Sequence, residues 1–166
     1  FMIRILDYWL SIIFILSLLA IGGALIAEFF YFLEPCKMCL KQRYPYYIII
    51  FLVTIFYFFR QSKNILLFIL TEIAIIYGLF YAVWHVGIEQ NILLGPQSCS
   101  GTLLKTTSLQ NLKEQINSQA IINCSEITWT MLGFSAATLN SLLLLFLLIF
   151  NTIFIVSNIY DFKKNN

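Results

Sequence analysis

Four cysteines carry the chemistry that this sequence offers, and two of them form a C-x-x-C pair, Cys36 and Cys39. In such a pair one thiolate attacks a disulfide and the other resolves the product, so the spacing is typical of dithiol exchange. Arg43 follows Cys39 by four residues, near the expected start of a helix. A cation and a helix N-terminus both favour a thiolate, which predicts a reactive sulfur at Cys39. The other two cysteines, Cys99 and Cys124, lie in a long polar segment.

The apolar composition of the chain indicates what kind of structural elements position these thiols. Of 166 residues, 60% are apolar and only 11% are charged, whereas soluble domains carry about 25% charged residues. The net charge of +2 is too small to indicate a nucleic-acid partner. We therefore expect an all-α membrane protein, a four-transmembrane-helix bundle that forms a single domain over residues 1–166.

The expected spans follow from long uncharged runs, each close to the roughly 20 residues that cross a bilayer. The first run is too long for the apolar core of a signal peptide, so we interpret it as a retained span. The second run, residues 44–59, is short, so its helix is expected to begin within residues 40–43, with Pro45 in the first turn. Gly133 and Ser135 separate the last span from the polar segment before it. The predicted spans are about 8–30, 41–59, 65–86 and 136–159, and the cysteine loops are about 31–40 and 87–135.

Four spans place both termini on one side of the membrane and both cysteine loops on the other. Lysine and arginine are divided five to five between the sides, so the positive-inside rule gives little guidance. Lys105 and Lys113 lie in a longer loop and count for less, which favours cytoplasmic termini. Free cysteines usually lie among apolar residues. Their absence from the expected spans, with all four on one side, therefore points to chemistry.

Three kinds of cysteine site fit this placement. Four thiolates resemble a structural zinc centre, although Cys99 and Cys124 lack the close spacing of a second zinc-binding pair. Two inert disulfides can brace an exported scaffold, but a C-x-x-C ring is small for that purpose. Two redox-active disulfides on one face can instead pass electrons from one pair to the other. A membrane setting then suggests a lipid-soluble acceptor, a quinone.

One carboxylate, Glu72, falls inside the third predicted span. A carboxylate in lipid is costly and therefore a functional candidate. The alternative is that it stays protonated or bonds a neighbouring helix, and the sequence assigns it no role.

Four blocks of residues stand in order over nearly the whole chain: Pro35-Cys36-x-x-Cys39-x-x-Gln42-Arg43, Trp84-His85-x-Gly87-x-Glu89, Gly95-Pro96-x-x-Cys99 and Cys124-Ser125-Glu126-x-x-Trp129-x-x-x-Gly133. In order and spacing, these blocks resemble the disulfide-bond-formation protein B (DsbB) family. The resemblance implies a bacterial inner-membrane four-helix bundle that reoxidises a periplasmic thioredoxin-fold dithiol oxidase of the DsbA type and passes the electrons to ubiquinone or menaquinone. The similar vitamin K epoxide reductase type remains an alternative, and the block around Cys124 argues for the first family.

The resemblance also implies a role for each site residue. Cys99 would be attacked by the partner's thiolate, and Cys124 would be its disulfide partner. Cys36 would exchange with these two cysteines, and Cys39 would lie against the quinone ring.

Two further residues would assist the quinone. Arg43 matches the family's arginine, and a fixed cation stabilises the negative charge that develops on quinone oxygens. His85, the only histidine, would either hydrogen-bond the quinone or pass protons, and the alternative is an interfacial polar group. Gln42 receives no role, and no metal is expected.

Overall fold

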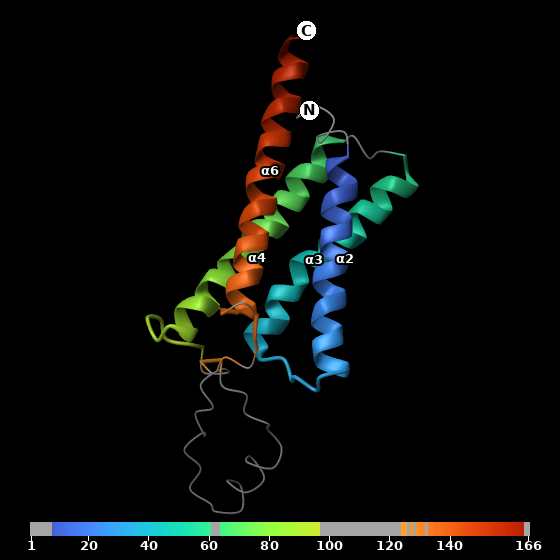
Figure 1. Cartoon of the computed structure of the whole chain (residues 1–166). Helices are drawn as coiled ribbons and strands as arrows, with labels where there is room; N and C mark the ends of the chain where they lie inside the picture. Colours follow the sequence, from blue (N-terminus) through green and yellow to red (C-terminus); the bar gives the residue numbers. More distant parts are fainter. Residues whose placement is uncertain are drawn as a thin grey trace, which may run out of the picture.

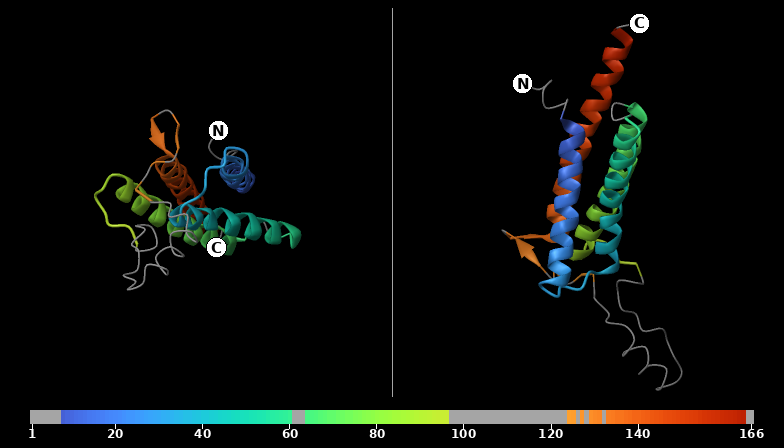
Figure 2. Two further views of the ribbon diagram at one scale, coloured as in Figure 1. Left: turned by 90° about the horizontal axis from the view of Figure 1, so that it is seen from below. Right: turned by 90° about the vertical axis from the view of Figure 1, so that its right-hand side faces the viewer.

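The computed structural model describes residues 8–60, 64–96, 124–125, 127, 129–131 and 133–164. Within these ranges the regular secondary structure is helical apart from one short hairpin, and turns and loops connect these elements. The helices are α2 (Trp9–Phe29), α3 (Lys37–Phe58), α4 (Ile65–Glu89) and α6 (Ala136–Lys164). Helix α4 packs against both α3 and α6, and α2 packs against α3. Figures 1 and 2 show this arrangement from three directions.

Three of these helices are long and apolar enough to cross a bilayer: α2, α4 and residues Ala136–Tyr160 of α6. Helix α3 has a similar length but does not meet the same criterion over the described residues. Its first two turns carry Lys37, Lys41 and Arg43, which lower the hydropathy of every window that includes them. The structure thus confirms the helical fold class, with three helices long and apolar enough to cross a membrane, and α3 as the fourth span remains a prediction.

The distribution of side chains is that of a membrane bundle. Large apolar side chains such as Leu19, Phe51 and Phe80 are exposed. Several polar side chains are buried instead, among them Gln42 and Asn151. Lipid is as apolar as these exposed residues, so the interior gains from packing and hydrogen bonds between helices.

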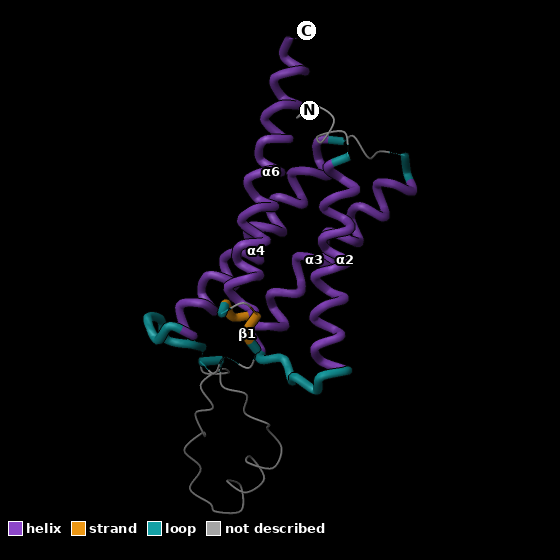
Figure 3. The backbone as a smooth tube through the Cα atoms, viewed as in Figure 1, coloured by secondary structure: helices purple, strands orange, loops and turns teal. Residues whose placement is uncertain are grey.

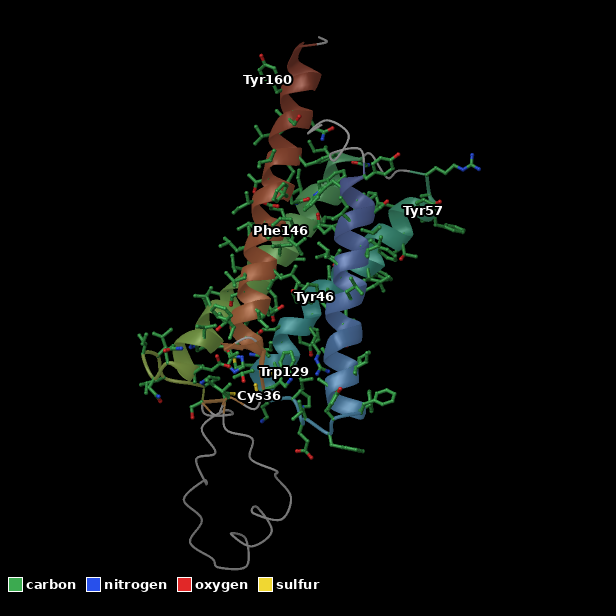
Figure 4. All side chains as sticks on the ribbon, in the orientation of Figure 1. Cys36, Tyr46, Tyr57, Trp129, Phe146 and Tyr160 are labelled. Carbon is green, nitrogen blue, oxygen red and sulfur yellow. The ribbon has the colours of Figure 1, made fainter. Side chains whose placement is uncertain are left out.

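The cysteine-bearing end lies opposite the end where both termini emerge. Figures 1 and 3 show the first and last helices reaching one end, and the loop between α2 and α3 at the other. In Figure 4, Cys36 and Trp129 lie together at this second end, far from Tyr160.

Helix α3 begins earlier than the sequence predicted, and the reason is Cys36. The backbone of Cys36 is extended, and its sulfur accepts the N–H of Cys39, which makes Cys36 the N-cap. Pro45 therefore lies inside the helix and not in its first turn. Gly78 of α4 accommodates the proline, because a Cβ at residue 78 would lie 2.5 Å from Pro45 Cγ.

The start of α6 is set by the hairpin of strands β1 (Thr130–Met131) and β2 (Phe134–Ser135), which pair antiparallel. Gly133 in its turn has a φ of +83°, a left-handed value that favours glycine. Ser135 Oγ accepts the Thr138 N–H at 3.2 Å and donates to Glu89 Oε2. The side chain of Ser135 therefore caps α6 and ties its start to the end of α4.

A polar cluster around Asn151 joins the helices toward the end where the termini lie. Asn151 is fully buried; its Oδ1 accepts the Trp9 indole N–H at 3.1 Å, and its amide donates to Glu72 at 2.6 Å. Thr152 donates to the other oxygen of Glu72. Of the two roles weighed for Glu72, bonding a neighbouring helix is the one observed.

Candidate active site

Cys36 and Cys39 lie at the N-terminus of α3 as free cysteines, with their sulfurs 2.7 Å apart. Cys36 is buried, and its sulfur also accepts the Cys39 backbone N–H at 3.1 Å. Since Cys36 faces hydrogen-bond donors on several sides, the proton that the pair shares belongs on Cys39. The hydrogen bond from Cys39, together with His85, lowers the pKa of Cys36 well below its ordinary value, although burial opposes this. The sequence argument favoured a thiolate at Cys39, whereas these contacts favour one at Cys36.

His85 reaches Cys36 from the last turns of α4. The imidazole is buried, and its Nε2 lies 3.7 Å from the Cys36 sulfur. Its other nitrogen, Nδ1, lies 2.8 Å from the side-chain nitrogen of Gln42. Glu89, one helical turn further along α4, places a carboxylate oxygen 4.0 Å from Nε2. His85 is thus a buried group between two helices and contacts one of the two sulfurs.

Cys124 brings the second cysteine segment to the same place. It is buried and disulfide-bonded, and its backbone interacts with His85. The sulfurs of Cys36 and Cys124 and a ring nitrogen of His85 all lie within 4.8 Å of one another. Cys99, the fourth predicted site residue, lies outside the described residues. Among the described residues, the structure therefore brings together Cys36, Cys39, Cys124 and His85.

The residue types in this cluster are those of a metal site, but the Cys124 sulfur is in a disulfide and is not a thiolate ligand. Thiolates bind metals, and the sulfur of a disulfide is not a thiolate. With Cys124 disulfide-bonded, the three-residue group offers only Cys36 and His85 as ligands. Structural zinc sites need four ligands.

Arg43 points toward α2, where it forms an ion pair with Glu28. Nη1 lies 2.5 Å from Glu28 Oε2, and Nη2 donates to the Ala24 carbonyl at 3.4 Å. In the sequence, Glu28 is the charged residue that ends the first long uncharged run. The pairing could have been predicted from the sequence, because Glu28 is a single acidic residue at the end of this run and Arg43 lies near the start of the next helix.

A cavity of about 640 Å³ connects these groups. Its walls come from α2, α3, α4 and α6, and the surface that lines it is mostly apolar. Cys36, Cys39 and Arg43 line it, together with His85. Residues that the sequence analysis left without a role also line it: Glu28's neighbours Ala24 and Ala27, Gln42, Tyr46, Glu89 and Asn140. The arrangement places a thiol pair and a cation beside an apolar cavity of the size of a small-molecule site.

Comparison with known proteins agrees with this geometry. The family model described as disulfide bond formation protein DsbB matches residues 7–154. A protein of Rickettsia prowazekii (strain Madrid E), described as uncharacterized protein RP370, is 31% identical over 137 residues, which cover 81% of this chain and 79% of that protein. No solved structure gives a significant match. The predicted resemblance is confirmed over most of the chain, and with it a membrane oxidoreductase of disulfide bond formation. The chain belongs to the disulfide bond formation protein DsbB family.

Proposed function

We propose that this protein oxidises a thioredoxin-fold dithiol partner outside the cytoplasm and delivers the two electrons to a quinone in the membrane. The observation that carries the proposal is the cavity beside the cysteines, because Cys39 and Arg43 line the same apolar chamber. Such a chamber suits a lipid-soluble acceptor better than a water-soluble one.

The thiol steps form a balanced exchange. A partner thiolate attacks Cys99 of a Cys99–Cys124 disulfide, a mixed disulfide forms, and Cys124 leaves as the thiolate. The Cys124 thiolate attacks Cys36 of an oxidised Cys36–Cys39 pair, and Cys39 leaves as the thiolate. The partner's second thiolate displaces Cys99 from the mixed disulfide, which releases the oxidised partner. The Cys99 thiolate then attacks Cys124, so that Cys99–Cys124 re-forms and Cys36 leaves as the thiolate. The grouping of the Cys36 and Cys124 sulfurs within 4.8 Å supports the attack of Cys124 on Cys36, since little movement brings them into contact.

The residues of the cavity fit a quinone. The volume of about 640 Å³ lies within the range of roughly 300–1,000 Å³ that is usual for small-molecule sites. Leu19, Ile26 and Leu143 supply apolar walls. When bound, a quinone supplies the capacity to accept two electrons and two protons. Arg43 is a fixed cation that stabilises negative charge in the chamber, and it stays oriented there through Glu28.

The proposed orientation follows from the two ends of the bundle. The cysteine-bearing end would face the periplasm of a bacterial inner membrane, and the end with both termini would face the cytoplasm (Figure 1). Disulfides persist in the periplasm and are reduced in the cytosol, so the chemistry requires this direction.

The test is quinone reduction by the purified protein, supplied with a reduced thioredoxin-fold oxidase of the DsbA type. We expect turnover by the natural chain and by Lys41→Ala, which changes a cation of the same helix that does not line the cavity. We expect none from Cys39→Ser or Cys99→Ser. Normal turnover by either serine variant would exclude the scheme. Stoichiometric metal on elemental analysis, with turnover abolished by a chelator, would instead favour a zinc site.

A further inference from the structure

A chain of hydrogen bonds runs from Tyr46 to His85 through two side-chain amides on different helices. The Tyr46 hydroxyl donates to Asn140 Oδ1 at 2.5 Å, and the Asn140 amide donates to Gln42 Oε1 at 2.8 Å. The Gln42 amide nitrogen then lies 2.8 Å from His85 Nδ1. The chain crosses from α3 to α6, returns to α3, and ends on α4.

The direction of this chain follows from its first member. Tyr46 is buried, and among the hydrogen bonds of the described residues its hydroxyl has only the contact with Asn140. A buried hydroxyl must donate its proton, so Asn140 presents its oxygen to Tyr46 and its NH₂ group to Gln42. Gln42 in turn presents its oxygen to Asn140 and its NH₂ group to His85.

The last link sets the imidazole. An NH₂ group donates only, so Nδ1 of His85 accepts and carries no proton in the neutral ring. The ring proton is then on Nε2, which faces the Cys36 sulfur at 3.7 Å. A neutral histidine therefore donates to Cys36 without needing to be protonated.

We infer that Gln42 is a positioning residue which, oriented by Asn140 and Tyr46, holds His85 as the Nε2–H tautomer so that the imidazole donates a hydrogen bond to the Cys36 sulfur. The inference rests on the proposed function in that it takes Cys36 as the sulfur that exchanges with Cys124. The buried amides then have a chemical role, because the orientation of the Gln42 amide decides which ring nitrogen of His85 carries the proton.

The other charged and titratable groups near Cys36 act alongside this chain. Cys39 and Arg43 approach from α3, and Glu89 approaches from α4. Cys124 approaches from the second cysteine segment, and Glu28 of α2 is paired with Arg43. Residues 136–159 of α6 carry no titratable side chain, so Asn140 acts through hydrogen bonds alone.

The decisive variant is Asn140→Asp, which changes a residue that does not contact His85. A carboxylate only accepts, so Gln42 must turn its NH₂ group toward residue 140 and its oxygen toward His85. His85 Nδ1 must then carry the proton, and Nε2 faces Cys36 without one in the neutral ring. Gln42→Glu makes the same demand directly, because its carboxylate also only accepts.

The tautomer is measurable because the chain has one histidine. Protein labelled with ¹⁵N-histidine in lipid nanodiscs gives one pair of ring nitrogen signals, read at a pH where the ring is neutral. We expect a protonated Nε2 and a bare Nδ1 in the natural chain, and the reverse in Asn140→Asp. Asn158→Asp is the matched control, since Asn158 is exposed and, within the described part of the chain, donates only to the Phe154 carbonyl one turn earlier in α6. It should keep the natural pattern.

A second readout is the alkylation of Cys36 in the fully reduced protein without quinone or partner. Cleavage after Lys37 separates Cys36 from Cys39, so mass spectrometry follows each thiol. Loss of a hydrogen bond to a charged sulfur should move the pH midpoint of Cys36 alkylation up by about one unit in Asn140→Asp, so that alkylation below this midpoint slows about tenfold. A natural chain with its proton on Nδ1, or an Asn140→Asp variant with the natural tautomer and alkylation rate, would overturn the inference. If the protein failed to reduce quinone, the proposed function would be refuted, but the His85 tautomer and the alkylation of Cys36 would still test the inference.

Discussion

The sulfur of Cys36 lies 3.7 Å from Nε2 of His85, although 49 positions separate the two residues in the chain. The contact joins the start of α3 to the last turns of α4, and Cys124 meets the same pair. One buried imidazole therefore adjoins both cysteine segments.

The first prediction concerns the pH dependence of Cys36. The donors around Cys36 lower its pKa below the ordinary value of 9.0, so Cys36 is a thiolate over a pH range where an ordinary thiol is protonated. His85→Ala removes one donor and raises that pKa, so the midpoint of the alkylation profile should move up by about one pH unit, with rates about tenfold lower below the midpoint and little change at pH 7. Rates of Cys36 alkylation between about pH 3 and about pH 9 measure this. An exposed substitution at the end of the same helix, Gln90→Ala, should leave the profile unchanged. A His85→Ala profile that overlays the natural one would remove His85 from the site.

The second prediction concerns Arg43. Arg43→Ala removes the cation from the cavity wall, so the KM for quinone should rise at least about tenfold, the usual effect of losing a hydrogen bond to a charged group. Formation of the mixed disulfide with the partner at Cys99 should persist, because that step precedes the quinone. Steady-state kinetics with varied quinone measure the first effect, and non-reducing gels measure the second. Unchanged quinone kinetics would exclude Arg43 from the mechanism.

The third prediction concerns the buried cluster around Asn151. Asn151→Ala leaves one carboxylate oxygen of Glu72 and the Trp9 indole N–H without their partner, and unsatisfied buried polar groups cost about 1–3 kcal/mol each. Thermal unfolding in detergent should show a clear loss of stability. Asn158→Ala, the same change at an exposed position of the same helix, should show almost none. Equal melting temperatures for the two variants would mean that the cluster does not stabilise the bundle.

The fourth prediction contrasts two glycines. Gly78→Ala places a Cβ 2.5 Å from Pro45 Cγ, which forces α3 and α4 apart and should destabilise the protein by about 1–3 kcal/mol. Gly23→Ala meets nothing within 4 Å and replaces a poor helix former, so stability should stay the same or rise by up to about 1 kcal/mol. Unfolding of both variants under one condition gives the comparison. A stable Gly78→Ala protein would show that α3 can move at this contact.

Local patterns in the sequence predicted the helical membrane class and the family, because long apolar runs and motif spacing are properties of the chain itself. Three runs are long and apolar enough to cross a bilayer in the described structure. Helix α3 is less clear because the charges that belong to the site, including Lys41 and Arg43, lie in its own first turns. Functional residues there weaken the hydropathy signal that identifies a span.

Most contacts within the site could not be predicted from the sequence. Gln42 received no role because its partners, His85 and Asn140, lie 43 and 98 positions away and are brought close only by helix packing. The cap formed by Cys36 was also missed, since the helix was expected to start later. The roles assigned to Cys99 remain predictions, because that residue lies outside the described structure.

Helix α6 is joined to its neighbours by polar contacts at two separate levels, Asn140 near the cysteines and Asn151 farther along. The two residues are eleven positions apart, which corresponds to about 16 Å of helix axis. Between them lie mostly leucines, whose apolar contacts resist separation of the helices but tolerate sliding and rotation. Hydrogen bonds are directional, so bonds at two levels of one helix fix both its position along its axis and its rotation about that axis. The register of α6, and so the placement of Asn140 beside Gln42, therefore depends on a cluster far outside the redox chamber.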